Sequence, residues 1–153
     1  MSNGSKLVLA LSALTMVCVV VIATAILTGG DADDALVSLE DLEEHGVMEF
    51  EEEHVFLVFN DGEPLALSDD PQHLQGEYVE WCESSQMFEA PTHGEKFDRL
   101  GNYYAGPAAR GLARYPLYVE GGGVYVDLED QIPGPERGAD EVLEPEGPYC
   151  VTD

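Results

Sequence analysis

Short apolar runs separated by turn residues, between positions 47 and 128, constrain the fold of this chain most strongly. Asn60-Asp61-Gly62 and Gly121-Gly122-Gly123 are typical of hairpin turns. Strands are expected at Phe50 and at residues 55–59, 78–81, 115–120 and 123–128. Several short strands at close spacing predict an all-β fold, either a sandwich or a small barrel.

The N-terminal part predicts a membrane segment. Residues 7–28 carry no charge and are rich in Leu, Val, Ile and Ala, and the stretch is long enough to cross a bilayer as a helix. Lys6 precedes this segment and aspartates follow it, so the positive-inside tendency places the N-terminus in the cytoplasm. Ala23-Thr24-Ala25 has the form of a cleavage site, and a cleaved signal peptide is the alternative. We expect a single-pass cell-membrane protein with an extracytoplasmic C-terminal domain.

The charge is strongly negative. The 153 residues include 31 acidic and 6 basic residues, for a formal net charge of -25. This excludes a nucleic-acid-binding protein, because the chain has too few cations to neutralise phosphates. Two interpretations remain: a surface adapted to concentrated salt, or an acidic docking face for a basic partner such as a cytochrome. Lysine occurs only at Lys6 and Lys96, and this scarcity along the whole chain favours salt adaptation.

Two histidine motifs lie on either side of the strand expected at 78–81. The first is Pro71-Gln72-His73-Leu74, and the second is Ala90-Pro91-Thr92-His93-Gly94, which Gly106-Pro107-Ala108 follows. This succession resembles the C-x-H and C-x-x-H loops and the proline loop of Rieske iron-sulfur domains, over roughly half of the chain. The resemblance implies an antiparallel β-sandwich or small barrel with a loop-rich tip, which binds the cluster in that family.

The resemblance also implies that His73 and His93 are retained cluster-type histidines. A Rieske centre holds one iron by two cysteine thiolates and the other by two imidazoles. Pro71 and Ala90 stand at the two cysteine positions, and neither side chain can ligate iron. We therefore expect no cofactor. A [2Fe-2S] cluster with ligands from elsewhere in the chain is an alternative.

A single metal ion at His73 and His93 is the other alternative. Asp69, Asp70 and Glu95 are near enough in sequence to add carboxylate oxygen. Two histidines with a carboxylate can bind one Zn, Fe or Cu ion.

Other groups of the family site are also replaced. Respiratory Rieske proteins brace the two loops with a disulfide, and the matching positions, near Gly76 or Glu77 and at Thr92, hold no sulfur. They also direct a serine and a tyrosine hydroxyl at the cluster, where this chain has Glu95 and Phe97. The joint absence of ligands, brace and tuning hydroxyls indicates a lost site.

Three cysteines are present. Cys18 lies in the apolar segment and is interpreted as a small buried hydrophobic residue. Cys82 and Cys150 would both face an oxidising compartment, where a disulfide between them is a candidate. Sequence gives no distance between the two sulfurs, so a bond and two free thiols both remain open.

The expected organisation has five parts. Residues 1–6 form a cytoplasmic N-terminus, 7–28 a transmembrane helix, and 29–49 an acidic linker with a short helix over 35–44. Residues 50–130 form the Rieske-like domain, and 131–153 an acidic tail rich in proline and glycine. The tail is expected to lie extended over the domain or to remain mobile.

These observations predict a membrane-anchored domain without its cluster, acting as a structural or interaction subunit of a membrane complex, with electron transfer as one such process. The alternatives are a Rieske electron-transfer protein and a metal-binding module that uses the two histidines. No catalytic residues can be singled out, and we expect no enzyme activity of the chain alone.

Overall fold

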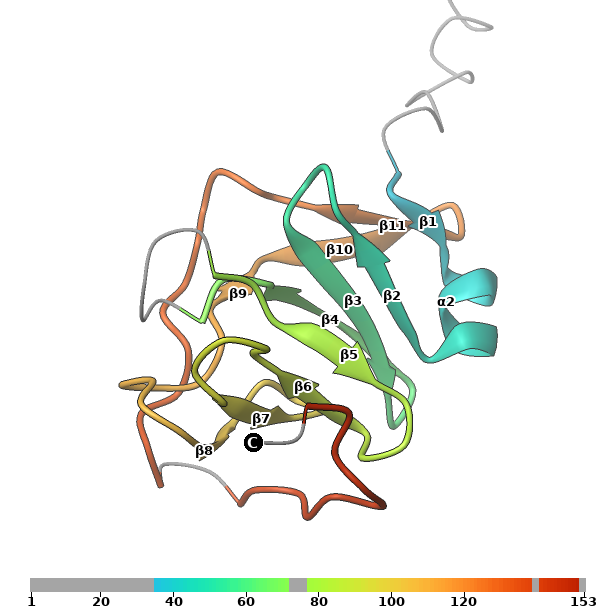
Figure 1. Ribbon diagram of the computed structural model, residues 1–153. Coiled ribbons are helices and arrows are strands. Elements are labelled where there is room, and N and C mark those ends of the chain that lie inside the picture. Colours follow the sequence, from blue (N-terminus) through green and yellow to red (C-terminus); the bar gives the residue numbers. More distant parts are fainter. Residues whose placement is uncertain (1–34, 72–76, 139–140, 152–153) are drawn as a thin grey trace, which may run out of the picture. The chain divides into compact units, whose positions relative to one another are not determined.

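The computed structural model describes residues 35–71, 77–138 and 141–151 (Figure 1). The expected cytoplasmic end, the expected transmembrane helix and His73 therefore lie outside the described residues. Within the described ranges, no helix combines the length and the apolar character needed to cross a membrane.

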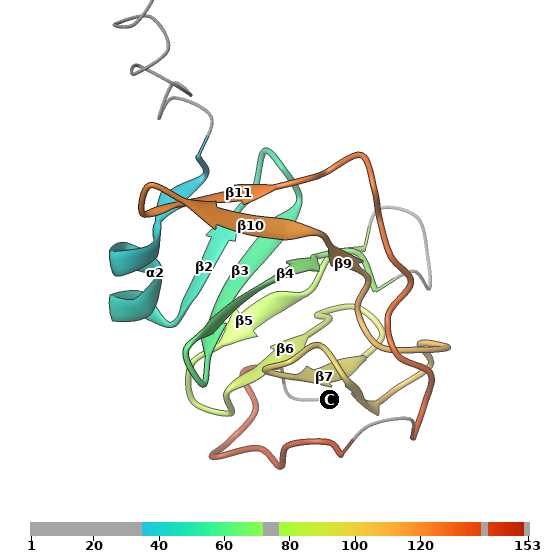
Figure 2. The ribbon, with the colours of Figure 1, turned by 180° about the vertical axis from the view of Figure 1, so that it is seen from behind.

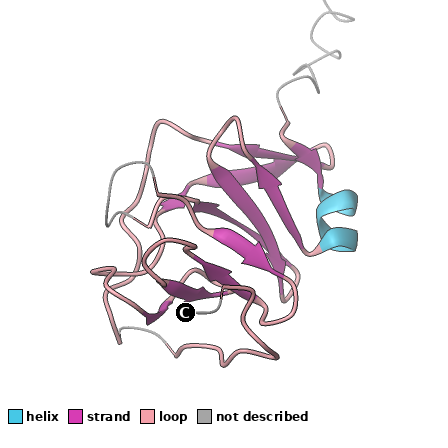
Figure 3. Ribbon diagram, viewed as in Figure 1, coloured by secondary structure: helices cyan, strands magenta, loops and turns pink. Residues whose placement is uncertain are grey.

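The regular elements of the described chain are short strands and one short helix, joined by long loops (Figure 3). In chain order, the elements are β1 (Val37–Ser38), α2 (Leu39–His45), β2 (Val47–Phe50), β3 (Val55–Asn60), β4 (Glu63–Ser68), β5 (Glu80–Cys82), β6 (Met87–Glu89), β7 (Lys96–Asp98), β8 (Tyr103–Ala105), β9 (Arg114–Tyr115), β10 (Leu117–Glu120) and β11 (Gly123–Val126). The strands form three antiparallel sheets, ordered β1-β11-β10, β2-β3-β4-β9 and β5-β6-β7-β8. The predicted all-β class is confirmed.

Both predicted hairpin turns form. β3 and β4 pair from Val55 with Ser68 to Asn60 with Glu63. The turn between them uses Asp61 and Gly62, both at positive φ. β10 and β11 likewise meet at Gly121 and Gly122, where positive φ favours glycine.

Residues 35–49, expected as a linker with a short helix, are part of the folded unit. The Ser38 side chain accepts a hydrogen bond from the Asp41 amide and caps α2, and Gly46 ends the helix at φ 76°. On either side of this helix, β1 pairs with β11 and β2 pairs with β3. Short strands of this kind carry little sequence signal, because the pairing partner supplies their stability.

The central sheet, β2-β3-β4-β9, is buried on both faces along β3. Successive side chains of a strand point to opposite faces, and four consecutive β3 residues, 55–58, are fully buried. Phe56 and Val58 pack into one core with Phe88 and Phe97 of the third sheet. Val55 and Leu57 pack into a second core, with members from α2 and β11. Figure 2 shows β10 and β11 on the side of the central sheet away from β6 and β7.

The C-terminal tail lies extended over the domain, which is one of the two expected arrangements (Figure 1). The Ile132 and Arg114 main chains exchange two hydrogen bonds of 2.8 Å. Farther along, the amides of Leu143 and Val151 donate to the buried carboxylates of Asp98 and Glu89, at 2.9 and 2.8 Å. The tail therefore supplies hydrogen-bond donors to acidic groups that are buried in the domain.

Candidate functional site

The second histidine motif forms a tight loop between β6 and β7. The Ala90 amide donates to the Glu95 carbonyl at 2.9 Å, and the Gly94 amide donates to the Ala90 carbonyl at 3.2 Å. Gly94 has φ 71°, a conformation that favours glycine. This closed loop holds Ala90 in the core while His93 is exposed.

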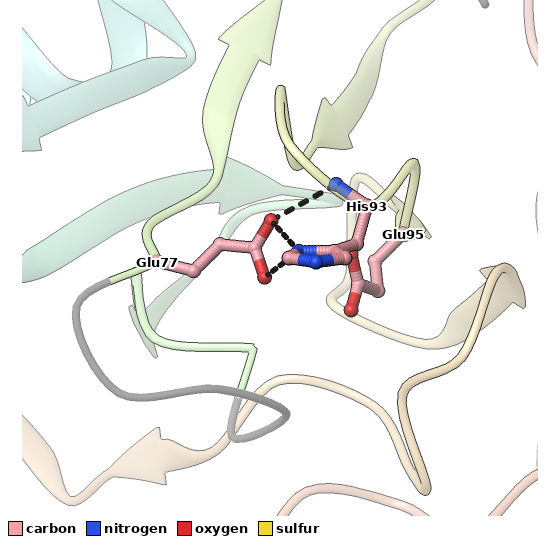
Figure 4. A group of neighbouring side chains, drawn as sticks. All are labelled: Glu77, His93 and Glu95. Carbon is pink, nitrogen blue, oxygen red and sulfur yellow. Dashed lines mark hydrogen bonds and ion pairs between the residues drawn. The ribbon is translucent and has the colours of Figure 1, made fainter.

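His93 contacts a carboxylate that sequence reasoning did not assign to the site. Its Nδ1 lies 3.1 and 3.0 Å from the two carboxylate oxygens of Glu77, and its amide donates to Glu77 Oε1 at 3.1 Å (Figure 4). The Glu77 side chain is 5% exposed and that of His93 is 39% exposed. Glu77 thus fixes both the main chain and the ring of His93.

Glu95 is the most unusual residue of the loop. It is fully buried, and neither carboxylate oxygen has a hydrogen-bond partner among the described residues. The proline loop lies directly against it, since a Cβ at Gly106 would be 2.6 Å from the Glu95 Cα. The Tyr103 hydroxyl donates to the Gly106 carbonyl at 2.6 Å, and Arg137 Nε donates to the Ala108 carbonyl at 2.7 Å. The strand β8 and the tail therefore hold the loop that covers Glu95.

Glu77, His93 and Glu95 form one cluster (Figure 4). One ligand atom from each lies within 4.8 Å of those of the other two. Imidazole nitrogen and carboxylate oxygen are both metal ligands. The sequence pointed to His93 and Glu95 as site residues. It matched Glu77 only to a cysteine position of the family disulfide, because no sequence rule links a glutamate to a histidine 16 residues later.

Asp69 was a candidate ligand, but it forms a different pair. His54 Nδ1 lies 2.9 Å from Asp69 Oδ2, and the His54 ring stacks on Tyr78 with centroids 4.8 Å apart. Burial raises the pKa of the Asp69 carboxyl, and the hydrogen bond to His54 opposes this shift. Asp69 is therefore already engaged with a histidine outside the Glu77, His93 and Glu95 cluster.

Comparison with known proteins decides the family. No family model matches the chain. The chain is 30% identical over 82 residues to the cytochrome b6-f complex iron-sulfur subunit of Chlorobaculum tepidum, covering 54% of this chain and 45% of that protein. It is 30% identical over 96 residues to the 3-phenylpropionate/cinnamic acid dioxygenase ferredoxin subunit of Shigella flexneri, covering 61% of this chain and 91% of that subunit. This chain belongs to the Rieske family.

A solved structure supports the Rieske assignment. The plasma membrane Rieske protein PetC3 of Synechocystis aligns with a TM-score of 0.51 and 28% identity, over 61% of this chain and 97% of PetC3. The chain spans less than half the length of the cytochrome b6-f subunit, of which it covers 45%. The shared region is thus a Rieske-like domain.

The Rieske pattern can now be placed on the described residues. Pro71 and Ala90, at the two expected cysteine positions, are both buried, and Ala90 packs in the core with Phe88 and Phe97. Of the two expected histidines, His93 is exposed in the loop between β6 and β7, and His73 lies outside the described residues.

Cys82 and Cys150 form a disulfide in the structure, with their Cα atoms 5.8 Å apart. The bond joins β5 to the end of the tail. In the described part of the chain, both cysteine sulfurs are therefore bonded to each other.

Proposed function

We propose that this chain is a Rieske-like domain without an iron-sulfur cluster, anchored to the membrane and serving as a structural or interaction subunit of a larger complex. The observation that carries the proposal is the buried alanine at position 90, where the Rieske pattern requires a thiolate. The domain keeps the Rieske fold around this position, so its surface and packing remain available for assembly.

The described residues do not fit a [2Fe-2S] cluster. The Ala90 methyl and the Pro71 ring have no lone pair for iron, and both positions are buried. Cys82 is bonded to Cys150, so no free thiol remains in the described ranges to take their place. At the same tip, Glu95 brings a carboxylate next to His93. An oxygen-rich site differs in kind from the sulfur ligands that Rieske clusters use.

Two features of the chain and one aligned structure support an extracytoplasmic, membrane-anchored location. A disulfide is typical of oxidising compartments, and residues 7–28 have the length and composition of a transmembrane helix. The aligned PetC3 is itself a plasma membrane Rieske protein.

The role of a subunit is supported by the relatives, both of which are named as subunits, of a cytochrome b6-f complex and of a dioxygenase. We propose that the partners are other subunits of a membrane electron-transfer complex. The net charge of -25 suits a basic, cytochrome-like partner as well as concentrated salt. The chain itself is proposed to be non-catalytic.

Iron and acid-labile sulfide analysis of the purified full chain tests the absence of a cluster, with an EPR spectrum of the dithionite-reduced sample. We expect neither iron nor sulfide in stoichiometric amounts, and no [2Fe-2S] signal. A cluster-loaded Rieske protein purified by the same protocol is the control for cluster loss. A rhombic [2Fe-2S] signal would establish the alternative, an electron-transfer protein.

Detergent extraction of the chain from native membranes tests whether it is a subunit of a membrane complex. In mild detergent and molar salt, the chain should migrate in a native gel with integral membrane subunits. Variants that lack residues 7–28 should lose this association. A chain that leaves the membrane without detergent, and migrates alone, would contradict both anchoring and assembly.

A further inference from the structure

The buried carboxylate of Glu95 has no function in the proposed subunit role. Burying a carboxylate without a hydrogen bond is strongly unfavourable, because the group loses its hydration and gains nothing in return. In the described structure, both Glu95 oxygens lack such a partner. The second acidic residue of the cluster, Glu77, is also buried, so two acidic groups are held close together away from water.

Lys96 follows Glu95 in the sequence and Arg137 holds the proline loop, but both side chains have other contacts. Lys96 Nζ lies 4.7 Å from the centre of the Tyr149 ring. The Arg137 guanidinium lies over the Tyr103 ring at 4.1 Å and donates to main-chain carbonyls of the proline loop. The ion pairs between described residues do not include Glu95. The cluster thus has two carboxylates and no lysine or arginine paired with them in the described ranges.

We propose that Glu77, His93 and Glu95 bind a single divalent transition-metal ion, for which Zn²⁺ is the best-matched probe. Zn²⁺ accepts imidazole nitrogen and carboxylate oxygen at about 2.0–2.2 Å and is stable with three protein ligands and one water. The ligand atoms already lie within 4.8 Å of one another, so side-chain rotation brings them to one ion. The ion neutralises the two carboxylates and replaces the hydrogen bond between His93 and Glu77.

The surroundings favour occupancy of this site. The 39% exposed His93 side chain gives an ion access from solvent and leaves room for a water ligand. The main chain of Glu95 packs against that of Gly106, which holds the backbone of this ligand in place before an ion binds. This inference goes beyond the proposed subunit role and does not depend on any partner.

The test is Zn²⁺ binding to the full chain in detergent, in molar potassium chloride with a large excess of Mg²⁺. Salt and Mg²⁺ suppress non-specific binding to the acidic surface, because carboxylates alone suit Mg²⁺ and imidazole favours Zn²⁺. We expect one tightly bound Zn²⁺ per chain and a rise in melting temperature with Zn²⁺ concentration. X-ray absorption should show a nitrogen and oxygen shell at about 2.0–2.1 Å with one imidazole and no sulfur.

Three variants make the test specific. His93→Ala and Glu95→Gln should each weaken Zn²⁺ binding by about 100-fold or more, since even outer-shell partners contribute about 10- to 100-fold. His54→Ala is the matched control, because it removes the histidine of the other histidine–carboxylate pair, with Asp69 at 2.9 Å. His54→Ala should bind Zn²⁺ as the wild type does. Glu95→Gln keeps the shape and removes the ionisable group, so its metal-free form should melt no lower than the wild type.

Several outcomes would overturn the metal site. These are the absence of stoichiometric Zn²⁺ under these conditions, wild-type affinity in Glu95→Gln, or an equal loss in His54→Ala. Any of them would leave Glu95 without a metal-binding role. Failure here is distinguishable from failure of the proposed function, because the latter is decided by iron, sulfide and the EPR signal of a sample never exposed to Zn²⁺.

Discussion

At the scale of single residues, the burial of Glu95 depends on the close approach of the Gly106 loop to the loop between β6 and β7. Gly106 has φ 94°, and its Cα has no room for a methyl group, because the Glu95 main chain lies against it. The proline loop thereby helps to exclude water from Glu95, which is fully buried.

Replacing Gly106 by alanine should destabilise the domain by about 3 kcal/mol, from backbone strain and the clash with Glu95. Gly62→Ala is the control, since Gly62 has φ 88° and no heavy atom within 4 Å of the position that a Cβ would take. Gly62→Ala should lower the free energy of unfolding by about 1 kcal/mol, from backbone strain alone. Urea unfolding in molar salt measures both, and equal losses would show that the loop contact carries no energy.

Asp69 gives a pH-dependent prediction. Burial raises the pKa of its carboxyl above 3.8, so the folded state binds this proton more tightly than the unfolded state does. The resulting stability is fully present below about pH 3.8 and is lost as the pH rises through the folded pKa.

In Asp69→Asn the side chain at this position does not titrate, so the variant should not lose this contribution to stability as the pH rises. The free energy of unfolding of the wild type, relative to Asp69→Asn, should therefore fall from about pH 3.5 to about pH 5, below the usual range of histidine titration. Denaturant unfolding in molar salt measures the difference at each pH. A difference that stays constant with pH would refute the raised pKa.

At the scale of elements, the tail and its disulfide complete the domain. The main chain of the tail supplies amide donors to Glu89 and Asp98, and the bond from Cys150 to Cys82 closes a separation of 68 residues. Cys82, Glu89 and Asp98 all lie in the third sheet, whose strands have only three residues each.

Removing the disulfide should lower the free energy of unfolding by about 2–4 kcal/mol, because the unfolded chain gains the entropy of an open loop. The measurement compares Cys82→Ala/Cys150→Ala with the oxidised wild type in denaturant. Reduced wild-type protein is the control and should approach the double variant. Unchanged stability on reduction would show that the tail docks without help from the bond.

At the scale of the whole molecule, the excess of acidic side chains governs how stability responds to salt. A net charge of -25 on 153 residues produces strong self-repulsion in the folded state. Salt screens it, because the Debye length falls from about 10 Å at 0.1 M to about 3 Å at 1 M.

The melting temperature should therefore rise with potassium chloride between about 0.1 M and 2 M. A variant with Glu51, Glu52 and Glu53 changed to glutamine should show a smaller rise, since these residues are concentrated in the turn between β2 and β3. Sucrose at matched osmolality is the control, because it stabilises folded proteins by exclusion from their surface but does not screen charge. A melting temperature indifferent to salt would contradict salt adaptation.

The sequence alone determined the fold class, the two hairpins and the loop with His93. These features are local: a turn needs residues that tolerate positive φ, as at Gly62 and Gly122, and an apolar run such as β3 must be buried. The short strands β1, β6, β7 and β8 were not predicted as separate strands, because their pairing is stabilised by packing against segments distant in sequence.

Only the tertiary structure decided how the chemical groups combine. Glu77 reaches His93, the Gly106 loop covers Glu95, and Asp69 pairs with His54. Sequence separation does not fix such distances, because each depends on how sheets and loops pack. The expectation that Pro71 and Ala90 cannot ligate iron came from the sequence alone, since their side chains lack ligand atoms. Only the folded chain shows that Glu77, His93 and Glu95 lie close enough to be proposed as ligands of one ion.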